Sequence, residues 1–572
     1  MDSSYYKNKL NTLKLGILRL YKSLSPERVI LFWSLLFISF ILFFSSLVVY
    51  NNRFLISIPT YGGLIKEGII GTPRFINPIL ATSDQDKDLT SLIYAGITKK
   101  DTQGHIILDV AETIVETDDK LHYEVTIKKS AEFHDGTPLT ADDIIYTVSL
   151  IQNPILKSPH YIEWEGVSIE KINDKKIIFS LKKPFPLFMD ILTVGIVPKH
   201  IWKNLNEDQI SLSDYNIHAI GSGPYSIKKV ATNSGIPTIF TLESHKKYTL
   251  GRPYITTLII STYQNEKYLF KAFEDGTIER IHGISPDKIG TLNILKDKVH
   301  TSLLPRTFAI FFNPNKQNIL LDKDIRKALQ MAINKDAIVN EVLHKYGKVI
   351  NDPYPFDENG SVSLYDVTKA KEILLENKSI TKNASTSLKI TLATANTEEM
   401  KKVAEMIKSD WEKIGVETTI TIYEVSDLNQ SVIKDRDFEA LLFGTITQSP
   451  SDLYAFWHSS QRTYPGLNIS NYVSKKLDSN LETLRNNNDE LSRVSAYEDV
   501  KKEFIEEVPG IFLYAPSLIY VTNDKTVSPL PYYSFDNSSR FTLIESWHTY
   551  TDHVWPKVYH KQLLTLLENI IH

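Results

Sequence analysis

The chain has 572 residues, too many for one ordinary hydrophobic core, so two or three domains or lobes are expected. Hydrophobic residues make up 42% and charged residues 23%, as in a globular protein, and the net charge of −4 offers no basic face for nucleic acid. The absence of cysteine excludes disulfides, thiolate metal sites, a cysteine nucleophile and a lipid-modified N-terminal cysteine.

The first predicted element is an apolar helix at 29–50, which contains no charged residue. A run of about 20 apolar residues is long enough to span a bilayer. Basic residues dominate 1–28, whereas Arg53 is the one charge close behind the run, so the tail should be cytoplasmic and the main domain extracytoplasmic. A cleaved signal peptide is the alternative, but its apolar region would be shorter, about 7–15 residues. We therefore expect an uncleaved single-pass anchor in the cell membrane, followed by a tether at 51–61.

Beyond the tether, strands and helices alternate along the chain. Alternation of apolar and polar residues predicts a strand at 175–181. A strand at 387–392, a helix at 397–414 with one apolar face and a strand at 416–423 form a β-α-β unit. Such a unit predicts a parallel sheet that is covered by helices.

Residues 132–149 (EFHDGTPLTADDIIYTVS) place His134 beside Asp135, which raises the question of a catalytic or metal site. Adjacent residues on an extended segment point to opposite faces, so these two side chains are not expected to aim at one metal ion. Thr140 and Asp143 fit a capping box at the start of a helix. The stretch therefore predicts local structure rather than catalysis.

The same stretch resembles a signature segment of the periplasmic oligopeptide- and dipeptide-binding proteins (solute-binding protein family 5), the extracytoplasmic receptors of peptide ABC importers. Other segments resemble further motifs of that family, in the same order. They are a first loop at 71–84, the helix that follows it at 92–100 (LIYAGITKK), a G-T-G-P-Y-like turn at 220–225, a V-R-Q-A-L-like helix at 324–342 and a P-D-L-Y-x-F-W-H-S-like run at 450–461. The resemblance covers about residues 62–556.

The resemblance implies an α/β, two-lobed periplasmic-binding-protein fold of the class II type, with an inserted subdomain and a ligand cleft that closes about a hinge. We expect the chain to enter the second lobe at 308–313 and to return to the first at 515–522. The implied division places lobe I at 62–85, 205–303 and 520–556, its inserted subdomain at 86–204, lobe II at 304–519, and an amphipathic C-terminal extension at 557–572.

In this family, peptide ligands add as a strand between two loops, one from each lobe. By motif position the loops map to Ala81-Thr82-Ser83 and Gly444-Thr445-Ile446, where Thr445 replaces the usual tryptophan. Members that take peptides usually carry an aspartate shortly after the second loop, which pairs with the ligand's α-ammonium, but here Gln448 stands in its place. Nearby Asp452 is the candidate substitute. Otherwise the ligand has no free α-amine or is not a peptide.

Two more side chains are candidates for ligand binding. Arg74 offers a bidentate fork for a ligand carboxylate, or only ties down its own loop. Trp457 could line the pocket, although core packing is the more frequent role of such an aromatic side chain.

The expected function is capture of a solute and its delivery to an importer. No H-E-x-x-H, G-x-S-x-G or Walker A sequence is present, so we expect no enzyme, no cofactor and no metal site, and transport energy from the importer's ATPase. The expected partners are a peptide or other small ligand, the permease subunits of an ABC importer and, through 29–50, the membrane. A non-peptide ligand, or a scaffolding or signalling role without transport, is the alternative.

Overall fold

The computed structural model describes residues 25–185, 187–292, 298–356, 364–377, 388–487, 489–531, 534 and 536–554. The chain forms two compact units, one of residues 1–60 with 550–572 and one of residues 61–549. The predicted C-terminal extension at 557–572 and most of the predicted cytoplasmic tail lie outside the described residues.

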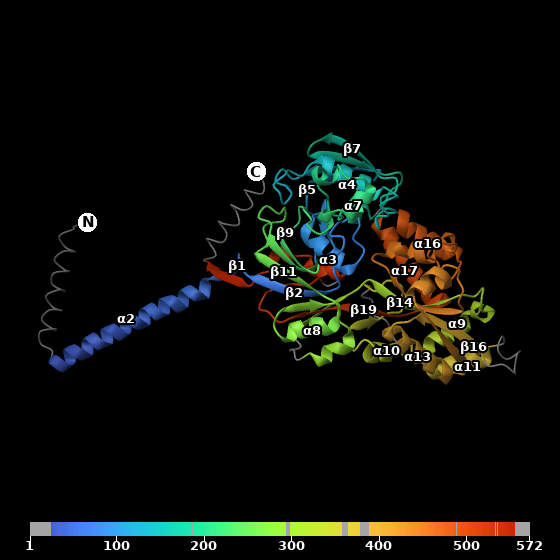
Figure 1. Ribbon diagram of the computed structural model, residues 1–572. Helices are drawn as coiled ribbons and strands as arrows, with labels where there is room; N and C mark the ends of the chain where they lie inside the picture. The colour runs from blue at the N-terminus through green and yellow to red at the C-terminus, as the bar shows by residue number, and fades with distance from the viewer. Residues whose placement is uncertain are drawn as a thin grey trace, which may run out of the picture. The chain divides into compact units, whose positions relative to one another are not determined.

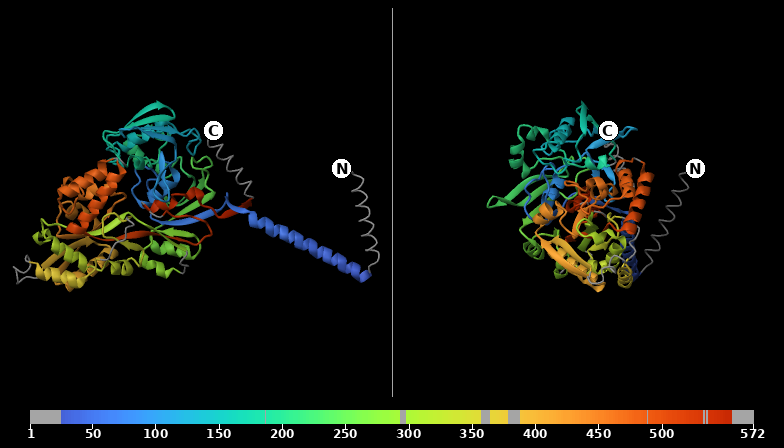
Figure 2. Two further views of the ribbon diagram at one scale, coloured as in Figure 1. Left: turned by 180° about the vertical axis from the view of Figure 1, so that it is seen from behind. Right: turned by 90° about the vertical axis from the view of Figure 1, so that its right-hand side faces the viewer.

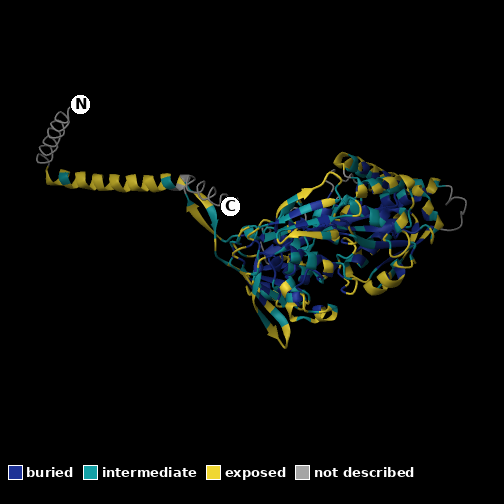
Figure 3. Cartoon of the chain, turned by 90° about the horizontal axis from the view of Figure 1, so that it is seen from above, coloured by how far each residue is buried: buried dark blue, intermediate teal, exposed yellow. Residues whose placement is uncertain are grey.

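The first unit contains α2 (Pro26–Phe54), β1 (Ile56–Thr60) and β20 (Tyr550–Val554). Proline in the first turn suits the start of α2, because no helical hydrogen bond is lost there. The segment Pro26–Asn51 has the length and composition of a membrane span, and its side chains are exposed along the helix (Figure 3). β1 and β20 pair as an antiparallel ribbon. Residues 56–60 of the tether are therefore paired with residues 550–554.

The second unit is built on a 12-stranded sheet (Figure 1). Its main path runs β17-β16-β18-β14-β19-β12-β2-β11-β10-β9, and β13 and β15 also pair with β19. The strands are β2 (Leu64–Ile70), β9 (Tyr225–Asn233), β10 (Ile236–Ser244), β11 (Thr257–Tyr263), β12 (Arg280–His282), β13 (Val299–Leu303), β14 (Arg306–Phe312), β15 (Gly347–Val349), β16 (Leu388–Ala395), β17 (Val416–Tyr423), β18 (Ala440–Ile446) and β19 (Gly510–Thr522).

The long strand β19 belongs to both lobes. Its residues 510–516 pair with β14 and β15, and its residues 517–522 pair with β12 and β13. The second crossing is the short connection 304–305 between β13 and β14. The two-lobed α/β fold is thus confirmed, and the limits given above for the lobes and the inserted subdomain stay predictions.

Helices cover both faces of the sheet in lobe II (Figures 1 and 2). Alternate side chains of β14 point to opposite faces of the sheet and pack into two hydrophobic layers. Ile310 and Phe312 belong to one of these layers, and Ala309 and Phe311 belong to the other. The first layer holds α9 (Lys323–Ala332), α10 (Lys335–Glu341), α11 (Val367–Glu376) and α13 (Glu398–Lys413), and the second holds α15 (Leu453–Trp457), α16 (Lys475–Asn486) and α17 (Glu490–Glu507).

In lobe I, α8 (Glu266–Glu274) covers one face of the sheet and α3 (Asp84–Ile93) lies on the other (Figure 1). The inserted subdomain shares a hydrophobic core with the α3 side, since Phe133 and Trp164 belong to the same buried cluster as Leu258 of β11. Its elements are β3 (Thr98–Lys100), β4 (Ile106–Leu108), β5 (Ala111–Glu116), β6 (His122–Ile127), α4 (Ala141–Ile151), β7 (Ser168–Asn173), β8 (Lys176–Ser180), α5 (Phe188–Ile191) and α6 (Lys199–Trp202), and α7 (Glu207–Leu212) follows.

Two local predictions are confirmed. β16 and β17 are parallel and are joined by α13, which Thr397 caps by accepting the amide of Met400. At the start of α4, the carboxylate of Asp143 accepts the amide and the hydroxyl of Thr140 at 2.8 and 2.9 Å. These predictions held because both depend on contacts between residues close in sequence.

Two helix predictions are wrong. Residues 92–100 contain the end of α3 and then β3, because Tyr94 takes an extended conformation (φ −113°, ψ 147°) that ends the helix. Residues 324–342 form two helices, α9 and α10, rather than one. Asn334 breaks the run, because its side chain accepts the amide of Ala337 and so starts a new helix.

Candidate ligand-binding site

The first candidate loop follows β2, whereas the second candidate segment, Gly444-Thr445-Ile446, forms the last three residues of β18 and is not a loop. The carboxyl ends of both strands point toward the middle of β19. In lobe II, Gly444 near the end of β18 lies opposite Phe308 of β14, which in turn lies opposite Tyr514 of β19. In lobe I, β2 is parallel to β12, and His282 at the end of β12 lies opposite Tyr520 of β19. The two candidate segments therefore lie on opposite lobes, and both approach the middle of β19, where this strand passes from lobe II to lobe I. Ligands of α/β sheets commonly bind outside the carboxyl ends of strands.

The loop after β2, residues 71–83, is fastened to α3 by Asp86. One oxygen of this carboxylate accepts the amides of Arg74 and Phe75 at 2.7 and 2.9 Å. The other oxygen accepts the hydroxyl of Ser83 at 2.6 Å, and Ser83 in turn caps α3 by accepting the amide of Asp86. The backbone of the loop is thereby held at both of its ends.

The four candidate residues in this loop differ in whether their polar groups are exposed or are used in hydrogen bonds within the loop. Ala81 is buried, and its amide donates to the carbonyl of Asn77 at 2.9 Å. Ser83 uses its hydroxyl locally, as described above. Thr82 and Arg74 are exposed, and the Arg74 guanidinium lies 5.5 Å from the centre of the Phe75 ring. The exposed groups of the loop are therefore a hydroxyl and a guanidinium.

The second candidate segment, residues 444–446, is the carboxyl end of a strand that has one unpaired side. β16 pairs with β18 at Ala440 and Leu441, whereas β14 pairs with β18 from residue 440 to residue 446. In the described part of the chain, residues 444–446 thus have a strand neighbour on the β14 side alone. The free side is an unpaired strand edge, which can accept another strand by main-chain hydrogen bonds.

The backbone at this edge rests on two stacked aromatic rings. A β-carbon at Gly444 would lie 2.8 Å from the ring of Phe308, so glycine is needed at this position. Phe308 stacks on Tyr514 with 4.9 Å between ring centres and 20° between planes. Thr445 is half-buried with its hydroxyl 3.5 Å from the carbonyl oxygen of Thr307, and Ile446 is 54% exposed. The exposed isoleucine offers an apolar surface beside the free edge.

The structure brings Gln448 and Asp452 together after this strand. One oxygen of Asp452 accepts the amides of Gln448 and Ser449 at 2.8 and 2.9 Å, and the Gln448 side chain is exposed. Burial raises the pKa of Asp452, and the charge of Glu163 in the inserted subdomain adds to the rise, although the two amides oppose it. A cation beside this carboxylate would stabilise its charged form.

Trp457 lies in the core of lobe II. The side chain is 2% exposed and packs against the rings of Phe311, Phe504 and Phe512. Packing is the role that this geometry supports, so we leave Trp457 out of the proposed site.

His134 and Asp135 point to different neighbours, as the sequence predicts. His134 accepts the amide of Gly221 at 3.2 Å and donates to the carbonyl of Gly223 at 3.1 Å, which ties this stretch to the 220–225 turn. The carboxylate of Asp135 lies 2.7 Å from a ring nitrogen of His200. Burial lowers the pKa of His134 to about 3, so the ring is neutral in the folded protein.

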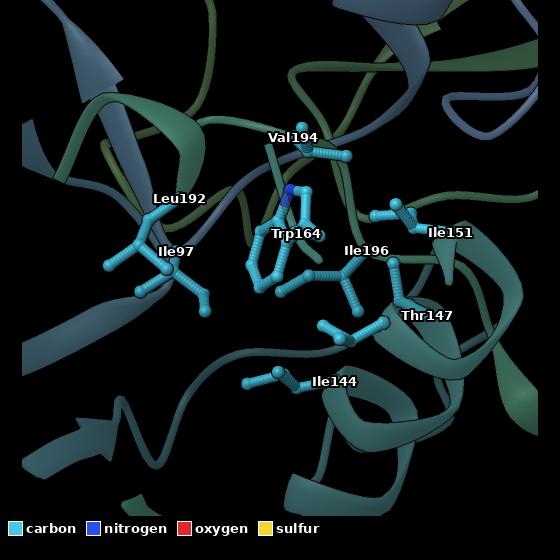
Figure 4. A pocket seen from close by; sticks show the side chains of 9 residues that line it. Ile97, Ile144, Thr147, Ile151, Trp164, Leu192, Val194 and Ile196 are labelled. Carbon is cyan, nitrogen blue, oxygen red and sulfur yellow. The ribbon is translucent and has the colours of Figure 1, made fainter. Parts of the chain in front are cut away.

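A small pocket lies inside the inserted subdomain (Figure 4). Its walls are almost entirely apolar, with Ile144, Trp164 and Ile196 among them. The hydroxyl of Thr147 is its one side-chain oxygen, and it is already bonded to Asp143 and Val197. The pocket therefore lacks the convergent polar groups of a ligand site.

Sequence reasoning missed three features of the candidate site. Asp86 had a visible signal, because Ser83-Asp84-Gln85-Asp86 is a capping-box pattern. The Phe308–Tyr514 stack and the free edge at 444–446 had none, because both depend on which distant strands pair.

The chain matches the family "Bacterial extracellular solute-binding proteins, family 5 Middle" over residues 105–465. It is 29% identical over 479 residues to the oligopeptide-binding protein AppA of Bacillus subtilis (strain 168), a match that covers 80% of this chain and 87% of AppA. A solved structure of AppA from Bacillus subtilis in complex with a nonapeptide is similar, with a TM-score of 0.65, 27% identity, and coverage of 86% of this chain and 99% of that one.

The fold is also that of NikZ from Campylobacter jejuni in complex with Ni(L-His), with a TM-score of 0.65, 23% identity, and coverage of 86% of this chain and 100% of that one. The relatives are solute-binding proteins of ABC transporters and not enzymes, as expected here. With a family match over more than half of its length, this chain belongs to the bacterial extracellular solute-binding proteins of family 5.

Proposed function

We propose that this protein captures oligopeptides outside the cytoplasm and delivers them to the permease of an ABC importer. The free edge of β18 at residues 444–446 is the observation that carries this proposal. A peptide that adds to this edge as a strand is bound through main-chain groups, so its side chains need not be specified. The loop Ala81-Thr82-Ser83 binds the peptide from lobe I. The nonapeptide in the similar AppA structure supports a ligand of this class.

Asp452 binds the ammonium group at the amino end of the peptide. Two backbone amides hold its carboxylate in place, and its raised pKa is what a partly buried carboxylate shows when no cation offsets its desolvation. The exposed guanidinium of Arg74 binds a carboxylate of the ligand from the other lobe. Charged groups from both lobes then favour closure of the lobes around a zwitterionic ligand.

The apolar helix α2 holds the protein in the membrane. Its span Pro26–Asn51 has the required length and hydropathy, and the excess of basic residues before it favours a cytoplasmic amino end. A tethered receptor meets a permease in the same membrane at raised effective concentration.

A non-peptide ligand is the second candidate. Gln448 replaces the aspartate that peptide-binding members usually carry, and the fold is shared with NikZ, which is in complex with Ni(L-His). This candidate keeps the closing lobes and changes the chemistry of the ligand.

Calorimetric titration with peptide mixtures tests the proposal. We expect mixtures of short peptides to bind the full-length protein in detergent, and the same peptides with acetylated amino ends to bind more weakly. Equal affinity for both forms would contradict the role of Asp452. Absence of binding by every peptide would contradict peptide capture and favour a non-peptide ligand or a scaffolding role.

A further inference from the structure

A buried guanidinium joins the two elements on either side of the first loop. Arg540 lies in the short 3-10 helix η8 (Asn537–Phe541) and is fully buried. Its two terminal nitrogens donate to the two oxygens of Asp88 on α3 at 2.6 and 2.8 Å, and its Nε donates to Glu67 on β2 at 2.7 Å. β2 leads into the loop 71–83 and α3 leads out of it. Arg540 therefore connects the entry of this loop to its exit.

The helix α3 links Arg540 to the backbone of the loop. Asp88, which Arg540 binds, and Asp86, which accepts the amides of Arg74 and Phe75, lie on the first turns of the same helix. η8 makes a second bond to α3, because Asn537 donates to Asp84 at 2.8 Å. A shift of α3 relative to β2 would thus carry the backbone of the loop with it.

Only a guanidinium suits this position among the natural side chains. Glu67 and Asp88 are 0% and 1% exposed, and carboxylates so deeply buried are costly unless they are paired and hydrogen-bonded. Burial alone would raise the pKa of Asp88, but Arg540 and then His282 hold the pKa below its ordinary value. Lysine would supply the charge without the planar fork that binds both oxygens of one carboxylate.

We propose that Arg540 is a positioning residue for the ligand site: by fixing α3 against β2 it sets the loop that binds the peptide from lobe I. Arg540 is fully buried, so it acts through the loop and does not touch the ligand. The inference rests on the proposed function, because only a ligand that uses residues 81–83 would respond to a displacement of this loop.

Arg280 provides a matched control. It is also fully buried in lobe I, and its Nε and Nη2 donate to the two oxygens of Asp524 at 2.6 and 2.9 Å. Its fork joins β12 to the segment after β19, and its Nη1 donates to the hydroxyl of Tyr520 at 3.1 Å, which in turn donates to Glu67 at 2.8 Å. Arg280 therefore reaches Glu67 only through Tyr520, and in the described part of the chain its guanidinium makes no bond to α3. Arg280→Lys therefore removes the same kind of buried fork from the same lobe.

The test compares Arg540→Lys with Arg280→Lys in the full-length protein in detergent, by hydrogen exchange of residues 71–83 and by peptide affinity. We expect exchange in this loop to be about tenfold faster, and peptide affinity about tenfold weaker, in Arg540→Lys than in Arg280→Lys. Equal exchange and affinity in the two variants would overturn the proposal. If Arg540→Lys does not fold, Asp88→Asn tests the same link, and unchanged exchange at 71–83 would then overturn it.

The outcome separates this inference from the proposed function. Faster exchange of the loop in Arg540→Lys, together with a wild-type protein that binds no peptide, would support the positioning of the loop and contradict peptide capture. Peptide binding by the wild type with equal exchange in both variants would support peptide capture and contradict the role of Arg540.

Discussion

The backbone amide of Gln448 donates a 2.8 Å hydrogen bond to the carboxylate of Asp452, which also accepts the amide of Ser449 at 2.9 Å. Gln448, which we expect from motif position to replace the usual aspartate, is thus bonded through its main chain to an aspartate of the same turn. This relationship makes Asp452 the first residue to test for recognition of a peptide's amino end.

Asp452→Asn should weaken the binding of peptides with a free α-amine by about tenfold or more, because a hydrogen bond to a charged group contributes about 1.5–3 kcal/mol. The same peptides with an acetylated amino end should bind wild type and variant alike. Calorimetric titration measures both. Asp437→Asn, at an exposed ion pair with Lys316 in lobe II, is the control. Equal loss for free and acetylated peptides would show that Asp452 acts only on the structure of its turn.

Gly444→Ala should destabilise the protein by about 1–3 kcal/mol, because the new methyl group overlaps the Phe308 ring and a packed core resists added volume. Urea unfolding measures the change in the free energy of unfolding. Gly290→Ala is the matched control, since no atom lies within 4 Å of a β-carbon there. If the two alanine variants were equally stable, the close packing of β18 on Phe308 would be refuted.

His134 should make the protein less stable in mild acid. Its pKa is about 3 in the folded protein, below the unfolded value of about 6.5, so between these values the unfolded chain binds a proton that the folded chain does not. The contribution of neutral His134 to the free energy of unfolding is therefore nearly complete at pH 7. This contribution is lost as the pH falls below 6.5, and about 2 kcal/mol is lost by pH 5.

The measurement is urea unfolding at pH 7 and pH 5 for wild type and His134→Gln. The variant should lack most of this pH-dependent loss, whereas His122→Gln, at an exposed position on β6, should keep it. The same pH dependence in wild type and His134→Gln would mean that His134 is not the group responsible.

The orientation of α2 can be tested cleanly because the chain has no cysteine. Ser57→Cys on the exposed face of β1 should react with a membrane-impermeant maleimide on intact cells, and Ser3→Cys should react only after the cells are opened. Loss of residue 3 from the mature protein would identify a cleaved signal peptide. Labelling of Ser3→Cys on intact cells would reverse the topology.

Much of the fold was predictable because its signals are local. The capping residues Thr140 and Asp143 and the helix between β16 and β17 depend on neighbours in sequence, and the order of several motifs carried the family resemblance. The break at Asn334 was missed because the apolar pattern continues through it, although an asparagine side chain can cap a new helix.

The site was less predictable because it depends on contacts between distant segments. Nothing near Glu67 indicates that Arg540, 473 positions away, would neutralise it, and the free edge of β18 exists only because β16 stops pairing after Leu441. The pairing of β1 with β20 likewise joins opposite ends of the sequence. Sequence patterns located the loops, but the neighbours that decide their chemistry come from the fold.

The most direct test of the central claim is native mass spectrometry of the full-length protein, purified in detergent without unfolding, followed by release and sequencing of the bound ligand. Peptide capture predicts a set of short peptides of mixed sequence, because main-chain pairing does not select side chains. A single non-peptide species, or an empty protein that stays empty when it is offered a peptide library, would contradict the claim.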